Sequence, residues 1–280
     1  MTRSRSMLWL IARRELALSL RSRSIQMFAV LFAALALMVA ASGYVLSGGS
    51  GFQDFSRTAA SLVELLLLLV PLTALIFGVT VLTPDVGAAE LLYSQPVERR
   101  TVLAGQLAGV FLALTAAQAV GLGLAGLVLF ARTGFDGLSG YLGLAAGSVA
   151  LTAVFLAIAA AIAAGHNSAR RARALASAVI IWLAAVVVID IAALGIASAL
   201  PSGLASKTII VSTLANPAGA VRTAVLMMIE GTAAFGSASM ALVRFTGGVA
   251  SMSAWLVLSI LVWIVAPLVV ATSRLRKTDL

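Results

Sequence analysis

The chain has 280 residues, of which 61% are hydrophobic and 10% are charged, and its formal net charge is +9. Soluble domains carry about 25% charged residues, so this chain cannot cover its surface with polar groups, and lipid must be its solvent. It has no cysteine, which excludes disulfides, thiolate metal ligands and a cysteine nucleophile.

The chain opens with a basic leader, residues 1–24. Its stretch Met7–Ser24 contains good helix formers and no Gly or Pro, which predicts a helix. Arginines mixed with leucines are typical of a helix lying in the membrane interface, although a plain topogenic leader has the same composition. A cleavable signal peptide is a third alternative, because small residues follow the apolar run Phe28–Val39. That run continues through Tyr44 and Leu46, which favours an uncleaved span.

Six apolar runs are long enough to cross about 30 Å of hydrocarbon. They cover about 25–47, 58–82, 101–131, 138–164, 175–200 and 252–273. The third run is long enough to require a tilt. There is no internal repeat and no segment with the composition of a soluble domain. The sequence therefore predicts an all-α polytopic membrane protein with one domain, residues 1–280.

The basic residues are unequally divided between the two sides of this predicted topology. Fourteen Lys and Arg residues lie in the leader, in 83–100, in 165–174 and in the tail, whereas five lie in the other connections. Clusters of this kind beside apolar runs set topology, and a nucleic-acid-binding module is not indicated. By the positive-inside rule, both termini and the 83–100 region are cytoplasmic.

The 83–100 region is a polar segment between the second and third runs. Thr83 precedes Pro84, which ends the second span and suits the first turn of a new helix. The sequence predicts a short helix parallel to the membrane, with one water-facing acidic side and one apolar side that fits a protein groove. The acidic residues are Asp85 and Glu90, and the apolar residues are Leu91, Leu92 and Tyr93. A simple inner loop resting on headgroups is the alternative.

The 201–251 region is expected to lie outside and to contain one short helix. Asn216 is a good N-cap, Pro217 a good first residue and Gly231 a good stop, which predicts a helix over 217–230. About 14 residues are too few to cross, so this helix should lie on the outer face or re-enter the membrane. Its Met227 and Met228 are weak candidates for Cu(I) ligands, but Met also fills apolar gaps.

Two acidic residues, Glu64 and Asp190, lie well inside predicted spans. Charges at this depth are costly and usually face protein or water. They either make buried structural bonds, with Arg57, Arg132 or hydroxyls as partners, or line a translocation path. The chain has a single histidine and no cysteine, which argues against an intramembrane hydrolase.

The stretch GAAELLYSQPVERRTVLAGQLAG resembles the cytoplasmic motif of ABC-2-type transporter permeases, which links the second and third of six spans. Matching positions are Gly87, Glu90, Leu91, Leu92, Ser94, Pro96, Val97, Arg99, Val102, Leu103 and Gly105. The opening IARRELALSLRSRS is similar to the family's elbow helix. Two departures are the single acid Asp85 before the motif and Gln106 in place of a common lysine. The resemblance implies that 83–100 is a coupling helix docking on a separate ATPase.

The words LANPAGAVRTAVL and EGTAAFGSASMAL resemble one branch of that family, the NosY-like permeases that support maturation of nitrous oxide reductase. Matching positions are Asn216, Pro217, Arg222, Glu230, Gly231, Gly236, Ser237 and Met240. The branch implies an outer β-helical accessory protein, which the outer helix would contact, and the handling of copper or sulfur species.

The chain has no G-x-x-x-x-G-K-[ST] motif, and its two lysines are Lys207 and Lys277. Together with the resemblance, this predicts the permease subunit of an ATP-driven exporter in the cell membrane. The chain would be a homodimer or a paired permease, without a catalytic residue or cofactor of its own, and ATP and Mg²⁺ would bind the partner ATPase. A secondary transporter using Glu64 or Asp190, or a non-transporting scaffold, remains an alternative.

Overall fold

The computed structural model describes residues 2–47, 52–83, 98–135, 137–164, 171–231 and 247–277. Within these ranges every regular element is a helix, which confirms the predicted all-α fold. The elements are α1 (Thr2–Arg21), α2 (Arg23–Ser47), α3 (Phe52–Leu82), α5 (Arg99–Thr133), α6 (Leu138–Ala163), α7 (Arg171–Leu183), the π-helix η2 (Ala184–Val188), α8 (Ile189–Ser198), α9 (Ser202–Ala215), α10 (Pro217–Glu230) and α12 (Val249–Lys277).

Six stretches of the described chain are long and apolar enough to cross a membrane, as the sequence predicted. They lie in α2, α3, α5, α6, the continuous α7–η2–α8 segment and α12. Helices α9 and α10 form a pair bent by 101°, which has the shape of a re-entrant or broken span. The sequence predicted only the second helix of this pair.

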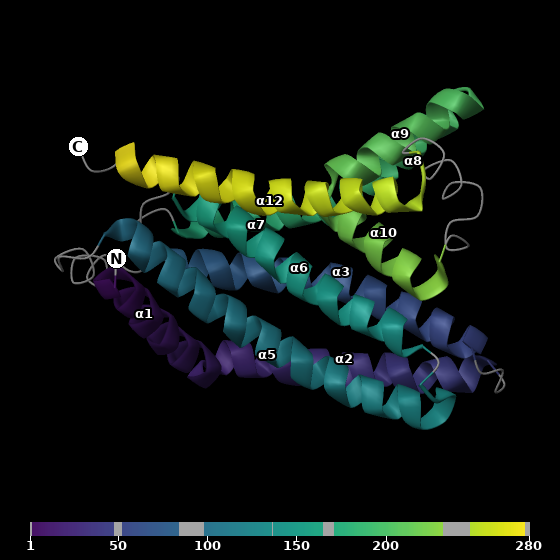
Figure 1. The fold of residues 1–280 in the computed structure, drawn as a ribbon, viewed down its shortest axis with the longest axis horizontal. Helices are drawn as coiled ribbons and strands as arrows, with labels where there is room; N and C mark the ends of the chain where they lie inside the picture. The colour runs from purple at the N-terminus through teal and green to yellow at the C-terminus, as the bar shows by residue number, and fades with distance from the viewer. Residues whose placement is uncertain are drawn as a thin grey trace.

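The helices form an elongated bundle in which α9 and α10 lie at one end (Figure 1). The start of α1 and the last turns of α12 lie at the other end (Figure 1). We call these the re-entrant end and the terminal end. The segment 84–97, which includes most of the predicted coupling helix, lies outside the described residues.

Helix α6 is the centre of the bundle. Of its most apolar window, 67% is buried within the chain, against 11% for each of the α7–α8 and α12 spans. Its neighbours are α3, α5, α10 and α12. Between α5 and α6, the Gln118 amide donates to the Thr152 hydroxyl at 2.9 Å, and the Tyr141 hydroxyl donates to the Leu122 carbonyl. These bonds satisfy polar groups that lipid could not.

Glycines allow two close helix contacts. A Cβ at Gly121 of α5 would lie 2.5 Å from the Phe32 ring of α2, whereas one at Gly123 would meet nothing within 4 Å. Of these two glycines, only Gly121 lies at a close helix contact. Helix α1 packs on α5 in the same way, since a Cβ at Gly109 would lie 2.8 Å from the Ala12 carbonyl oxygen.

A glycine row on α6 seats the re-entrant helix α10. Added Cβ atoms at Gly140, Gly143 and Gly147 would meet Ile229, Met228 and Val225 of α10 at 3.1, 2.8 and 2.3 Å. Small residues let helices approach closely in membranes. This close packing stabilises helix association there, because burying apolar side chains away from equally apolar lipid contributes little. This packing fixes α10 along the central helix.

Candidate functional site

Three polar side chains meet where the fifth span passes the re-entrant pair. Asp190 of α8 accepts from the Arg222 guanidinium of α10 at 2.5 Å. The Asn216 amide donates to the other Asp190 oxygen at 3.4 Å. Both charged side chains are less than one third exposed. Asp190 lies eight residues before Ser198, the end of its span, or about 12 Å along the helix, so the pair lies well inside the span.

Asn216 also joins this cluster to an irregular turn of the fifth span. The π-helix Ala184–Val188 interrupts the α-helical pattern there, and the Ile189 amide bonds to Ala184, five residues back. The buried Asn216 amide donates to the Ala185 carbonyl at 2.7 Å. Its side-chain oxygen accepts from the Ala218 amide at 3.2 Å, which caps α10. One side chain therefore satisfies a helix start and a carbonyl of the π-turn.

The partner of Asp190 differs from the sequence expectation. We expected Arg57, Arg132 or a hydroxyl group of a neighbouring helix, but the structure pairs Asp190 with Arg222. Arg57 is exposed, and the Arg132 side chain lies outside the described part of the chain. Because Arg222 lies on a re-entrant helix, it reaches into the bundle where an outer loop residue could not. The ion pair neutralises a carboxylate that would be costly alone in the membrane.

The other predicted residues of α10 also have internal contacts. Glu230 accepts from the Ser56 hydroxyl of α3 at 2.8 Å, and Pro217 is buried. Met227 packs beside Met252 and Leu256. Met228 is 60% exposed, so the two methionines lie in different environments. Among the described residues, no group of three or more His, Cys, Asp or Glu could hold a metal ion.

The surroundings of Glu64 on α3 differ from those of Asp190. Its side chain is exposed, and it has no hydrogen-bond or ion-pair partner among the described residues. It lies nine residues after Phe55, the start of its span, or about 14 Å along the helix. Arg57, Ser61 and Leu68 are exposed on the same helix face. Arg57, Ser61 and Glu64 make this the polar face of an otherwise apolar span.

The predicted ATPase-coupling residues lie outside the described part of the chain. They are Asp85, Glu90, Leu91, Leu92 and Tyr93. The described ends on either side are Thr83, after α3, and Glu98, before α5. The end of α3 and the start of α5 lie at the terminal end (Figure 1), where α1 packs on α5.

Comparison with known proteins identifies the family. Residues 9–280 match the family described as ABC-2 family transporter protein. The chain belongs to this family. A relative from Pseudomonas aeruginosa PAO1, "Probable ABC transporter permease protein NosY", is 30% identical over 275 residues, which cover 96% of this chain and 98% of the relative. A protein of the same description from Stutzerimonas stutzeri is 37% identical over 123 residues, covering 43% of this chain and 45% of that protein.

These matches confirm the resemblance to ABC-2 permeases and to the NosY-like branch. With six apolar spans, the chain is an integral, multi-pass permease subunit of an ABC transporter. Family membership indicates the membrane subunit rather than the ATPase itself, and it implies an ATPase partner.

Proposed function

We propose that the chain is the membrane half of an ATP-driven exporter, moved by a separate ATPase that docks on the 83–100 region. The family match over residues 9–280 carries this proposal. The absence of a phosphate-binding loop from the sequence supports it, because the energy must then come from another chain. ATP and Mg²⁺ would bind that partner, and the terminal end with both termini would face the cytoplasm.

The docking step can be tested with a double variant. Leu91→Asp with Leu92→Asp should abolish co-purification of the ATPase, because a carboxylate cannot enter an apolar groove without a large desolvation cost. Leu91→Met with Leu92→Met is the matched control and should retain binding. Equal amounts of the two variants in the membrane would show that the spans of the Asp variant still fold. Retained ATPase binding by the Asp variant would overturn the assignment of this region.

We further propose that a second copy of the chain covers the polar face of α3, so that Glu64 lines a shared path. A carboxylate facing lipid at this depth is unfavourable, and Glu64 has no partner among the described residues. Asp190, by contrast, is already neutralised by Arg222, so it is the weaker candidate for a path or a proton relay. Export through a dimer would bring the two Glu64 faces together.

The natural absence of cysteine makes this face easy to map. Disulfides require the two Cα atoms to lie within about 7 Å of each other. Because the two copies would meet at this face, a single Ser61→Cys variant should form a disulfide-linked dimer on mild oxidation. Val257→Cys, exposed on α12, is the control and should stay monomeric on a denaturing gel. Cross-linking of the control alone would place the contact between copies elsewhere.

For the cargo, we propose copper or sulfur species used in maturation of nitrous oxide reductase, together with an outer β-helical accessory protein. The full-length similarity to a NosY permease supports this branch. Deleting the gene for this chain should leave cells with nitrous oxide reductase that lacks its metal centre. Normal metal content in the reductase of the deletion strain would reject this cargo while leaving the permease assignment intact.

A further inference from the structure

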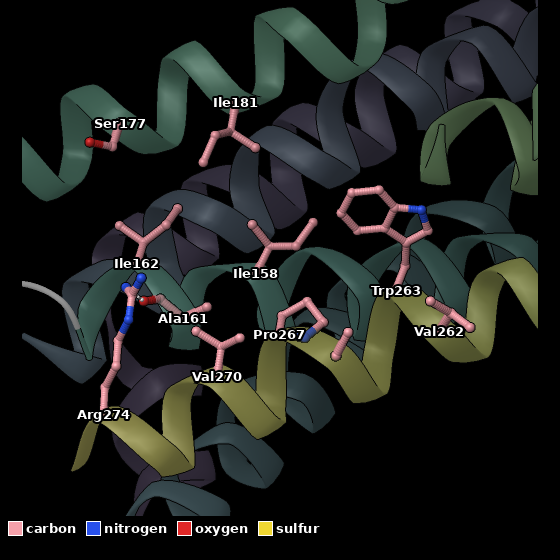
Figure 2. A pocket seen from close by; sticks show the side chains of 11 residues that line it. Ile158, Ala161, Ile162, Ser177, Ile181, Val262, Trp263, Pro267, Val270 and Arg274 are labelled. Atoms are coloured by element: carbon pink, nitrogen blue, oxygen red, sulfur yellow. Dashed lines mark hydrogen bonds between the residues drawn. The ribbon is translucent and has the colours of Figure 1, made fainter. Parts of the chain in front are cut away.

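A cleft at the terminal half of the bundle has the features of a lipid site. It has a volume of about 480 Å³ and lies between α6, α7 and α12 (Figure 2). This volume is in the range of small-molecule sites. Its walls are Ile158, Ala161 and Ile162 of α6, Ser177 and Ile181 of α7, and Val262, Trp263, Ala266, Pro267 and Val270 of α12. The walls are almost wholly apolar.

The one hydroxyl in these walls is already satisfied. Ser177 donates to the Arg173 carbonyl at 3.0 Å, within its own helix. The inner part of the cleft therefore has no side-chain group that would orient a polar ligand, and it fits a hydrocarbon chain. Trp263 lies toward one end (Figure 2), where its indole donates to the Ala215 carbonyl at 3.1 Å. That bond holds the ring in place.

The opposite end of the cleft is cationic. The Arg274 guanidinium lies there (Figure 2) and donates to the Ala161 carbonyl at 3.1 Å. Ala161 is in the last turn of α6, where carbonyls lack helical partners, so this bond orients the charge. Arg173, one turn from Ser177 on α7, is exposed at the same end. Arg274 therefore lines this end of the apolar cleft, and Arg173 lies one helical turn before the lining residue Ser177.

The length of the cleft matches one leaflet. Val262 and Arg274, which line its two ends, are twelve residues apart on α12, or about 18 Å. Half of the hydrocarbon thickness is about 15 Å. A chain lying in the cleft would reach from the membrane boundary at Arg274 to near the bilayer centre at Trp263.

We propose that this cleft binds an acyl chain of an anionic phospholipid, with the lipid phosphate at Arg274 and Arg173. Arginine is well suited to phosphate because its planar donors can form paired hydrogen bonds. A second copy of the chain is a poorer occupant. The dimer proposed above places that copy on the polar face of α3, and no residue of α3 lines this cleft.

The test uses the purified full-length chain in detergent and a phosphatidylglycerol carrying a photoreactive group on its acyl chain. Wild type should be labelled within α12 residues 262–274, at least fivefold more than with the matching phosphatidylcholine probe. Ala266→Phe adds a ring to the cleft from an exposed position and should reduce labelling at least fivefold. Arg274→Gln should reduce labelling with phosphatidylglycerol to the phosphatidylcholine level.

Two controls separate the site from general lipid contact. Leu258→Phe changes an exposed residue of α12 outside the cleft, and Arg57→Gln removes an exposed arginine near the other end of the bundle; both should label like wild type. Equal labelling by the two lipids, or unchanged labelling of Ala266→Phe, would overturn the proposal. Conversion of a dimer to a monomer by Ala266→Phe would instead assign the cleft to a contact between copies and would also overturn it.

Discussion

Two carboxylates inside the membrane spans have opposite surroundings. Asp190 lies against Arg222 and Asn216, and those partners are themselves held by the packing of α10 on the glycine row of α6. Glu64 is exposed on α3 with no partner among the described residues. The two residues look alike in the sequence, because each is a single acid in an apolar run.

The difference favours a structural role for Asp190 and the path role proposed above for Glu64. The Asp190 charge is neutralised within the chain by an ion pair that joins α8 to α10. A carboxylate left exposed at membrane depth requires another neighbour, such as a second copy, water or a substrate. The expected effects of substitution therefore fall on stability at Asp190 and on activity at Glu64.

The largest expected effect is on the ion pair. Arg222→Met should lower the free energy of unfolding by about 3 kcal/mol, because it leaves Asp190 charged without a partner. Adding Asp190→Asn should recover much of the loss, since an amide costs less to bury than a carboxylate. Denaturant titration of the detergent-solubilised chain would measure both. If the double variant were as unstable as the sum of the single variants, the pair would not be coupled.

The second expected effect concerns Asn216. Asn216→Ala removes the cap of α10 and the donor to the Ala185 carbonyl, and each loss is worth about 1 kcal/mol. The combined destabilisation should be about 2 kcal/mol in the same titration. Ser206→Ala is a suitable control, because Ser206 is partly exposed and its hydroxyl donates to the Ser202 carbonyl of its own helix. A neutral Asn216→Ala would mean that α10 does not depend on this junction.

The third prediction is that a substitution at Glu64 lowers activity and leaves stability nearly unchanged. Glu64→Gln should change the free energy of unfolding by less than about 0.5 kcal/mol, as for other exposed positions. If the α3 face is the path, the same variant should reduce transport-coupled ATP hydrolysis by the assembled complex at least tenfold, or about 1.4 kcal/mol. Normal hydrolysis with normal stability would remove Glu64 from the path.

The smallest effect is expected at a third carboxylate, which has intermediate surroundings. Partial burial of Glu15 between α1 and α5 raises its pKa, against the opposing influence of a hydrogen bond from Ser19 and the charge of Arg14. The folded state therefore holds this proton more tightly than the unfolded state. The contribution of Glu15 to stability should be greatest below its ordinary pKa of about 4.3 and should be lost as the pH rises through the raised pKa.

Glu15→Gln should remove this part of the pH dependence and raise stability at neutral pH by about 0.5 kcal/mol or less. Unfolding titrations of wild type and variant at several pH values would measure it. An unchanged pH profile in the variant would show that burial between α1 and α5 does not affect the Glu15 carboxylate.

Parts of the fold that depend only on residues nearby in the sequence could be predicted from it. Asn216, Pro217 and Gly231 predict a helix over 217–230, and α10 spans Pro217–Glu230. Helix α9 was not predicted, because SGLASKTIIVSTLA is rich in serine and β-branched residues and lacks a clear cap. The π-helix Ala184–Val188 has no local sequence signal, since its carbonyl partner lies on Asn216, about 30 residues away.

The sequence by itself determined that this is a helical membrane protein with six spans, because apolar length and composition are local properties set by the bilayer. It also drew attention to Glu64 and Asp190, because any charge inside an apolar run is conspicuous. Only the tertiary structure decided which of them is neutralised. The partner of Asp190 is Arg222, 32 residues further along the chain, and the bend between α9 and α10 brings them together. The cleft at Arg274 likewise exists only where three separate helices pack.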